Sequence, residues 1–228
     1  MRTLWTTLLI LIALALAPVA SAATPETLAT GCHQGQAEVC ADLGTQYQSG
    51  AGLEKDNRKA VAFYRQACAG KSARGCLNLA VMYYNGYGVS RDTVQAGVFY
   101  GHACDGKVGE GCLHLGEMYE ERGDMEAVAA TLYRRACDGQ AVRGCMKLGV
   151  MYHDGRGVPQ DKSTAMALYR QACEGQEVRA CVMLGLHYRD GDGVRQSDDE
   201  AHKYFRKACN QGDAEVCHLD RELGRITR

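Results

Sequence analysis

The sequence predicts an all-α protein built as a solenoid, a stack of helix pairs in which each pair contacts only its neighbours. All twelve cysteines fall into six pairs with the same eight-residue step, and the pairs start 36, 36, 33, 36 and 36 residues apart. An interval of this size and regularity indicates a structural repeat. Within each interval apolar residues recur with helical spacing, and no alternating pattern typical of a strand is present.

The N-terminus predicts a secretory signal peptide over residues 1–22. Arg2 precedes an apolar run from Leu8 to Pro18, which is followed by the small-residue sequence Ala20-Ser21-Ala22. A charged start, a short apolar region and an A-x-A site are typical of a cleaved signal peptide, and the run is short for a membrane span. We therefore expect a periplasmic or secreted mature chain, residues 23–228, that forms the solenoid and has no membrane span.

The charge balance argues against one class of partner. The chain carries 26 Lys and Arg residues against 27 Asp and Glu residues, a formal net charge of −1 at pH 7, and no block of like charge stands out. Nucleic-acid binding needs a basic footprint, so no nucleic-acid partner is expected.

Each full repeat begins with a predicted helix that contains the second cysteine of a pair, here named helix A. Leucine follows this cysteine by three residues and tyrosine by seven, which places all three on one helical face. The residue after the leucine is always small, so a partner helix can approach closely. The five sets are Leu43, Gly44, Tyr47; Leu79, Ala80, Tyr83; Leu115, Gly116, Tyr119; Leu148, Gly149, Tyr152; and Leu184, Gly185, Tyr188.

Helix A ends in a Gly-x-Gly turn in four of the five copies. Glycine supplies the positive φ that ends a helix and turns the chain. The middle copy is three residues shorter and has Arg122-Gly123-Asp124 instead, which we interpret as a shortened loop. A residue able to cap the next helix follows each longer turn, namely Asp56, Asp92, Asp161 or Ser197.

The second helix of each repeat, helix B, carries an alanine, an aromatic residue four positions later and another alanine before the cysteine. The sets are Ala60, Tyr64, Ala67; Ala96, Tyr100, Ala103; Ala129, Tyr133, Ala136; Ala165, Tyr169, Ala172; and Ala201, Phe205, Ala208. Residues 24–32 predict a lone helix B, and residues 215–225 a lone final helix A in which Asp220 replaces the expected leucine. Polar end helices cover the open faces of a stack, so about twelve helices are expected.

These patterns resemble a known family. Leu-Gly-x-x-Tyr, Gly-x-Gly-Val, Ala-x-x-x-Tyr-x-x-Ala and the period near 36 resemble the Sel-1-like repeats, relatives of the tetratricopeptide repeats. Cysteines eight apart in every repeat are similar to its secreted branch, the cysteine-rich Hcp proteins. The resemblance implies a right-handed α/α superhelical solenoid with one disulfide per repeat and an adaptor or scaffold role. For the Hcp branch it also implies binding of penicillin-like compounds with weak β-lactamase activity.

The cysteine pairs have a functional interpretation and a structural one. Structural zinc sites use cysteines about two to four residues apart, and no Cys-x-x-Cys redox motif is present. In a secreted chain, paired cysteines are typical of disulfides that stabilise the fold. We therefore expect six local disulfides, closed in chain order: Cys32 with Cys40, Cys68 with Cys76, Cys104 with Cys112, Cys137 with Cys145, Cys173 with Cys181, and Cys209 with Cys217.

No complete motif for catalysis or for phosphate or metal binding is present. Gly70-Lys71-Ser72 lacks the earlier glycine of a phosphate-binding loop, and no serine β-lactamase motif or Gly-x-Ser-x-Gly occurs. The segment from Asp190 to Gly193 lacks the spaced ligands and glutamate of a calcium loop. We predict no cofactor, metal or catalytic residue. The seven histidines form no His-Glu-x-x-His motif and are interpreted as scattered surface or packing residues: His33, His102, His114, His153, His187, His202 and His218.

The surface expected to bind a partner is the concave wall of the stack. In tetratricopeptide-type stacks this wall is lined by helix A positions that correspond here to −2, +1, +5 and +8 from the second cysteine. They form a mostly apolar strip flanked by charge, which suits a peptide with mixed side chains. The alternative is that about half of the +1 and +5 side chains simply pack. The candidate residues are Arg74, Leu77, Val81, Tyr84, Glu117, Glu120, Arg143, Val150, His153, Arg179, Leu186 and Arg189.

Two functions from different classes follow. The first is a periplasmic or secreted scaffold that binds a protein or peptide through the concave helix A surface. The second is a weak β-lactamase or penicillin-binding protein of the Hcp type, with β-lactam compounds as ligands. Position +8 varies most in character among the repeats, so Tyr84, His153 and Arg189 are the side chains expected to anchor a peptide.

Overall fold

The computed structural model describes residues 24–123, 125–213 and 215–218. The predicted signal peptide lies outside the described residues, and so does the predicted final helix beyond residue 218. In the described part, no helix has the length and apolarity needed to cross a membrane. Eleven helices are defined there: α1 (Pro25–His33), α2 (Ala37–Ser49), α3 (Asn57–Ala69), α4 (Ala73–Asn85), α5 (Thr93–Asp105), α6 (Gly109–Arg122), α7 (Glu126–Asp138), α8 (Val142–Asp154), α9 (Lys162–Glu174), α10 (Val178–Asp190) and α11 (Asp198–Asn210).

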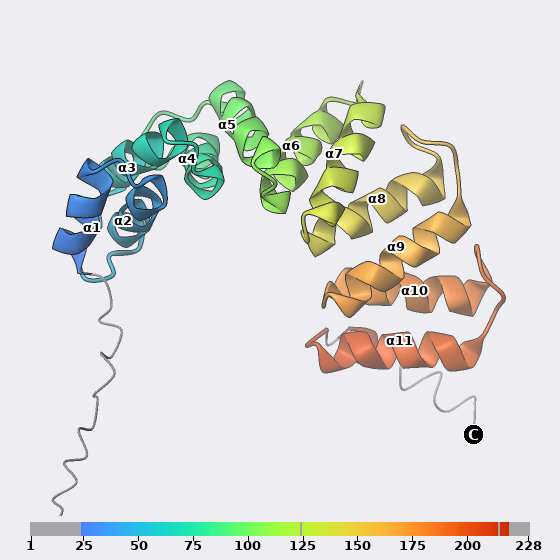
Figure 1. Cartoon of the computed structure of the whole chain (residues 1–228). Helices are drawn as coiled ribbons and strands as arrows, with labels where there is room; N and C mark the ends of the chain where they lie inside the picture. The colour runs from blue at the N-terminus through green and yellow to red at the C-terminus, as the bar shows by residue number, and fades with distance from the viewer. Residues whose placement is uncertain (1–23, 124, 214, 219–228) are drawn as a thin grey trace, which may run out of the picture.

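The helices follow one another along an arch (Figure 1). Each helix packs against the one before it and the one after it, and α2 also contacts α4, as α6 contacts α8. The predicted A helices are α2, α4, α6, α8 and α10, and the helices between and around them are the B helices. The predicted all-α stack of helix pairs is therefore confirmed.

The turns form as the local chemistry predicts. Gly50 ends α2 with φ of 80°, and the Asp56 carboxylate then accepts the backbone N–H groups of Arg58 and Lys59 at the start of α3. The second glycine of the turn after α8 has a packing reason. A Cβ on Gly157 would lie 2.3 Å from the carbonyl carbon of Glu126, the first residue of α7. Only glycine allows this turn to touch the preceding B helix.

The core lies between helix A and helix B of each repeat. Tyr64 and Phe205 of the B helices are fully buried. A Cβ on Gly44 would lie 2.6 Å from the Tyr64 ring, and one on Gly185 would lie 2.5 Å from the Phe205 ring. The small residue of helix A therefore receives the aromatic ring of helix B, which is how the predicted close approach of a partner helix is made. Burial of these rings is a main source of stability.

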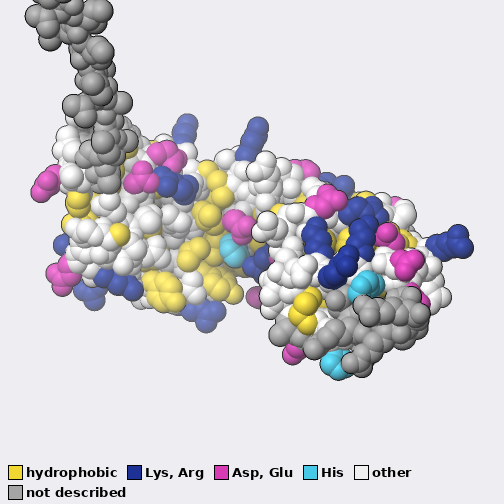
Figure 2. Space-filling view, turned by 90° about the horizontal axis from the view of Figure 1, so that it is seen from below, with side chains coloured by type: hydrophobic (Ala, Val, Ile, Leu, Met, Phe, Trp, Pro, Cys, Tyr) yellow, Lys and Arg dark blue, Asp and Glu magenta, His cyan; other side chains and the backbone are white. Residues whose placement is uncertain are grey.

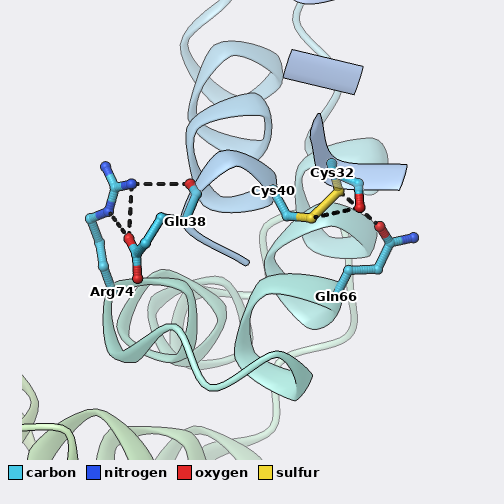
Figure 3. The surroundings of a disulfide bond; sticks show 5 residues. All are labelled: Cys32, Glu38, Cys40, Gln66 and Arg74. Atoms are coloured by element: carbon cyan, nitrogen blue, oxygen red, sulfur yellow. Dashed lines mark hydrogen bonds and ion pairs between the residues drawn. A yellow bond between two sulfur atoms is a disulfide. The ribbon is translucent and has the colours of Figure 1, made fainter. Parts of the chain in front are cut away.

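Five disulfides join a B helix to the A helix that follows, and the sixth joins Cys209 of α11 to Cys217, with Cα–Cα distances between 4.5 and 4.8 Å. Figure 3 shows the first, in which Cys32 at the end of α1 is bonded to Cys40 of α2. The Gln66 side chain of α3 reaches toward this bond, with its oxygen 3.1 Å from Cys32 Sγ. The expectation of one disulfide per repeat is confirmed.

Candidate functional site

Position +8 of helix A lies beside the aromatic residue of helix B in the same repeat. The Tyr64 hydroxyl donates a hydrogen bond to Gln48 Oε1 at 2.6 Å. In the second repeat, the rings of Tyr84 and Tyr100 lie 6.4 Å apart between centroids. In these repeats the +8 side chain is therefore placed at the hydroxyl end of the buried ring.

A hollow of about 460 Å³ lies between α4 and α6. It brings together four of the residues that the sequence predicts as partner-binding, because Val81 and Tyr84 contribute one wall and Glu117 and Glu120 the other. The other residues that line it are Asn85, Tyr100, His114, Met118, Glu121 and Lys147. One wall is thus apolar and aromatic, and the other carries carboxylates.

Glu117 is held on the acidic wall by two neighbours. Its carboxylate lies 3.0 Å from His114 Nδ1 and accepts a hydrogen bond from Arg143 at 3.0 Å. The hydrogen bond with His114 lowers the pKa of Glu117, and the charges of His114, Arg143 and Lys147 lower it further. Glu117 is therefore ionised at neutral pH.

Glu120 is the more strongly bonded carboxylate. It accepts the Tyr133 hydroxyl at 2.6 Å, Lys147 Nζ at 2.9 Å and an Arg156 nitrogen at 3.2 Å. Burial alone would raise the pKa of Glu120, but these three groups outweigh burial and lower it. The pKa of the Tyr133 hydroxyl is raised, first by burial and then by this carboxylate. Three of its neighbours therefore stabilise the charge of Glu120.

A second hollow, of about 800 Å³, adjoins the first and shares Tyr84, Met118 and Glu121 with it. Its floor includes the outer face of α5, where Val94 is 75% exposed and Val98 is 48% exposed. Figure 2 shows hydrophobic side chains gathered over the left half of the molecule and more charged ones over the right. The outer face of α5 was not predicted from the sequence, because the predicted binding surface included helix A positions alone. Apolar residues at exposed positions of helix B, such as Val94 and Val98, were a usable signal.

The other predicted binding residues do not gather into one site. Arg74 forms ion pairs with Glu38 and Asp42 of the preceding A helix, at 3.1 and 2.7 Å, and Figure 3 shows the first of these. Arg189 is paired with its neighbour Asp190 at 2.7 Å. Arg179 is exposed. Leu77, Val150 and Leu186 are half-buried against core clusters.

Packing accounts for part of the predicted strip. Among the +1 residues, Ala41 and Leu113 have no exposed surface and Met146 is 8% exposed. The alternative interpretation therefore holds for these three side chains. The candidate residues at the first hollow remain accessible, since Val81, Tyr84, Glu117 and Glu120 are all half-buried.

His153 belongs to a different group, at the ends of α8 and α10. Its Nε2 lies 2.7 Å from Asp192 Oδ2, and His187 Nδ1 lies 3.3 Å from the same oxygen. Lys162 Nζ lies 2.5 Å from Asp192 Oδ1. The hydrogen bonds from Lys162 and His153 lower the pKa of Asp192 to about 2.

The two histidines of this group have opposite pKa shifts. Hydrogen bonds with Asp154 and Asp192 raise the pKa of His153. Burial, followed by the charge of His153, lowers the pKa of His187. From the sequence, His187 is expected to be a scattered surface or packing residue, and His153 is also a candidate partner-binding residue. Their different repeat positions, +8 for His153 and +6 for His187, gave no reason to connect them. The available signal was the substitution at +6, where the three preceding repeats have methionine.

Comparison with known proteins identifies relatives of the fold. The family model of the Sel1 repeat matches residues 37–72, 73–106, 142–176 and 178–213. A protective antigen of uropathogenic Escherichia coli with an SLR fold is 28% identical, with a TM-score of 0.80 over 85% of this chain and 42% of that chain. A Sel1 repeat protein from Oxalobacter formigenes is 23% identical, with a TM-score of 0.76 over 86% of this chain and 77% of that chain. Helicobacter pylori cysteine-rich protein B is 25% identical, with a TM-score of 0.38 over 75% of this chain and 98% of that chain. A search of curated protein sequences finds no match.

Proposed function

The chain belongs to the Sel1 repeat family, and from this premise we propose that it is a periplasmic or secreted scaffold that binds a partner protein through the concave surface of its A helices. A Sel1 repeat scaffold fits a role in protein interaction. The observation that carries the proposal is the hollow between α4 and α6, which collects side chains from two successive A helices and opens to solvent.

The chemistry of the hollow selects the kind of segment it binds. Val81 and Tyr84 of α4 offer apolar contact on one wall, and α6 contributes Met118 and the carboxylates of Glu117, Glu120 and Glu121 on the other. An aromatic side chain at the centre of a surface is typical of a binding hot spot. Glu117 and Glu120 already bind protein cations, so Glu121 is the carboxylate that favours a basic residue next to the apolar or aromatic anchor of the partner segment. Tyr84 is the central contact because it is the aromatic side chain among the three residues that line both hollows.

The disulfides support the location. All twelve cysteines are closed in six bonds, which fits an oxidising compartment and is rare in the cytosol. The predicted signal peptide would deliver the chain to such a compartment. The periplasm or the cell exterior is therefore where the scaffold would meet its partner.

The proposal is tested with two tyrosines of the same repeat. Tyr84 lines both hollows, whereas Tyr87, in the turn that follows α4, is 49% exposed and lines neither. A photo-crosslinking amino acid placed at position 84 of the exported protein should capture a partner that the same group at position 87 does not. With that partner purified, Tyr84→Ala should weaken binding at least about tenfold, and Tyr87→Ala less than about twofold.

Circular dichroism and thermal melting of both variants should match the unmodified protein. Equal binding by wild type and Tyr84→Ala, or an equal loss in Tyr87→Ala, would show that the partner does not bind in these hollows.

The β-lactam alternative has a separate test. Neither a serine nor a cysteine is among the residues that line the first hollow, and two of its carboxylates are occupied by protein cations. Slow or absent turnover of a chromogenic cephalosporin is therefore expected. Fast turnover that one substitution abolishes would replace the scaffold proposal with an enzyme.

A further inference from the structure

Three potential metal ligands converge where the fourth and fifth A helices meet. One ligand atom from each of His153, His187 and Asp192 lies within 4.8 Å of the other two. In the described part of the chain, this His-His-Asp cluster is the one such set of three. Two imidazoles and a carboxylate are a ligand set that zinc and other divalent transition metals prefer.

His187 occupies a place that the repeat normally fills with an apolar side chain. At the same position, +6 from the second cysteine, Met82 and Met151 are fully buried. His187 is only 6% exposed, and its Nε2 has no hydrogen-bond partner among the described residues. A buried imidazole with an unpaired nitrogen is less favourable than methionine for packing. Packing alone therefore does not account for the histidine.

A second buried polar atom beside the cluster also lacks a partner. The Tyr169 ring stacks on His187 with centroids 5.6 Å apart, and no described residue bonds its buried hydroxyl. In the equivalent places, the Tyr64 and Tyr133 hydroxyls donate to the +8 residue of their own repeat. In the fourth repeat the +8 residue is His153, which is directed at Asp154 and Asp192 instead. The unpaired hydroxyl therefore reflects the turning of His153 toward the cluster.

The surroundings hold the ligands in an orientation suited to a cation. His153 Nδ1 lies 2.8 Å from Asp154 Oδ1, so a proton held there leaves Nε2 to act as a ligand. Lys162 binds Asp192 through Oδ1, which leaves Oδ2 directed at the two imidazoles. His153 and His187 also stand in the last turns of α8 and α10, where the helix dipole favours positive charge.

Two of the three ligand-atom distances are near those of a zinc site, and the third, between the two histidines, lies within 4.8 Å and must shorten by up to about 1.5 Å. Zinc with ligand bonds of about 2.0–2.2 Å in tetrahedral geometry holds its ligand atoms about 3.3–3.5 Å apart. His187 Nδ1 and Asp192 Oδ2 are already 3.3 Å apart, whereas His153 Nε2 and Asp192 Oδ2 are 2.7 Å apart and must separate. Asp192 stands between two glycines with positive φ in the turn after α10, and such a turn can move by this amount.

We propose that His153, His187 and Asp192 form a zinc site that links the fourth and fifth repeats. Nε2 of His153, Nδ1 of His187 and Oδ2 of Asp192 are the three protein ligands, and water takes the fourth position. Asp154 is the outer partner of His153, and Lys162 the outer partner of Asp192. The site does not depend on the partner-binding proposal, because it lies in other repeats and needs no partner protein.

The variant that tests the site is suggested by the residue that other repeats carry at the position of His187. His187→Met restores the side chain that two other repeats bury at this position, so the fold should be retained while one ligand is lost. The untagged, EDTA-treated mature protein is titrated with zinc chloride by calorimetry, and with cobalt chloride while the visible d–d absorption is recorded. All cysteines are in disulfides, so no thiol competes for the metal.

The wild type should bind one zinc ion per chain and give a cobalt spectrum typical of four-coordinate nitrogen and oxygen ligands. His187→Met and Asp192→Asn should each weaken zinc binding by more than about 100-fold. Asp154→Asn should weaken it by about 10–100-fold, as loss of an outer partner does. His33→Gln, which changes an exposed histidine of α1, should bind zinc as the wild type does.

Either of two results overturns the proposal. One is a wild type that binds no zinc at one equivalent and gives no cobalt absorption. The other is zinc binding by both His187→Met and Asp192→Asn with wild-type affinity, which would place the metal elsewhere.

Discussion

The third and fourth repeats use the same helix A position in opposite ways. At +8 of the third repeat, Glu120 accepts the hydroxyl of Tyr133 at 2.6 Å and binds Lys147 and Arg156. At +8 of the fourth repeat, His153 leaves the hydroxyl of Tyr169 without a partner in the described structure. The backbone and the buried ring are equivalent, so the difference is made by one side chain.

The other repeats clarify what this position does. In the first, Gln48 accepts the Tyr64 hydroxyl, as Glu120 accepts that of Tyr133. In the fifth, +8 is Arg189, which has no acceptor atom, and the buried ring is Phe205, which has no hydroxyl. The +8 side chain therefore either accepts the hydrogen bond of the tyrosine hydroxyl in its own repeat or makes contacts elsewhere. Variation at this position is not by itself a sign of partner binding.

The largest effect should come from removing what the two repeats share, the disulfides. In the chain-entropy account, each short loop contributes about 2–3 kcal/mol. Full reduction should therefore lower the melting midpoint by more than about 10 °C, while the far-UV spectrum below the midpoint stays helical because the buried rings and alanines remain. Circular dichroism melts with and without reductant measure this, with alkylating agent alone as control. An unchanged midpoint on complete reduction contradicts the prediction.

The next largest effect is a difference in stability between alanine variants at the +8 positions of the third and fourth repeats. Glu120→Ala leaves the Tyr133 hydroxyl without its acceptor and two cations without their carboxylate, and should cost about 2–3 kcal/mol. His153→Ala removes the contacts with Asp154 and Asp192, whose side chains are 43% and 35% exposed, and the ring contact with His187, at 4.7 Å between centroids. It should cost less than about 1 kcal/mol in metal-free buffer. Urea unfolding of both variants measures the difference, and equal costs would show that the two sites are energetically alike.

The sequence predicts the turns and the core because their causes are local. The cap at Asp56, the positive φ at Gly50 and the ring of Tyr64 against Gly44 follow from neighbouring residues or from one helix pair. The His-His-Asp cluster could not be predicted in this way. His153 and His187 stand at different positions of their repeats, so an alignment of repeats separates them. Their proximity depends on how one A helix is placed against the next.

A smaller difference in stability is expected when the hydroxyl groups of Tyr133 and Tyr169 are removed one at a time. Tyr133→Phe removes a buried donor bonded to a carboxylate and leaves Glu120 with one partner fewer, so it should cost about 1–2 kcal/mol. Tyr169→Phe removes a buried hydroxyl with no described partner and should change stability by less than about 0.5 kcal/mol. Phe205 shows that the fold accepts phenylalanine at this position. Chemical denaturation distinguishes the two variants, and a large cost for Tyr169→Phe would reveal a partner for that hydroxyl.

The smallest effect is the dependence of stability on pH that the +8 carboxylate of the third repeat contributes. The pKa of Glu120 is lowered from its ordinary value of 4.5. A carboxyl group whose folded pKa is depressed binds protons more readily in the unfolded state. Its stabilising contribution is therefore present above about pH 4.5 and is lost as the pH falls through the folded pKa.

Glu120→Gln removes this charge but keeps an acceptor for the Tyr133 hydroxyl, so the variant should be less stable than the wild type at neutral pH. The difference between their melting midpoints should stay constant from pH 7 to about pH 5.5 and shrink below about pH 4.5. His153→Gln is the matched control at the equivalent position and replaces no carboxylate. Its difference from the wild type should be retained through pH 4.5 and decline only below about pH 4, as the pH falls toward the pKa of Asp192, the carboxyl that His153 binds, which is about 2. A Glu120→Gln difference that persists unchanged to pH 3 would mean that the ionised carboxylate contributes nothing beyond its hydrogen bond to Tyr133.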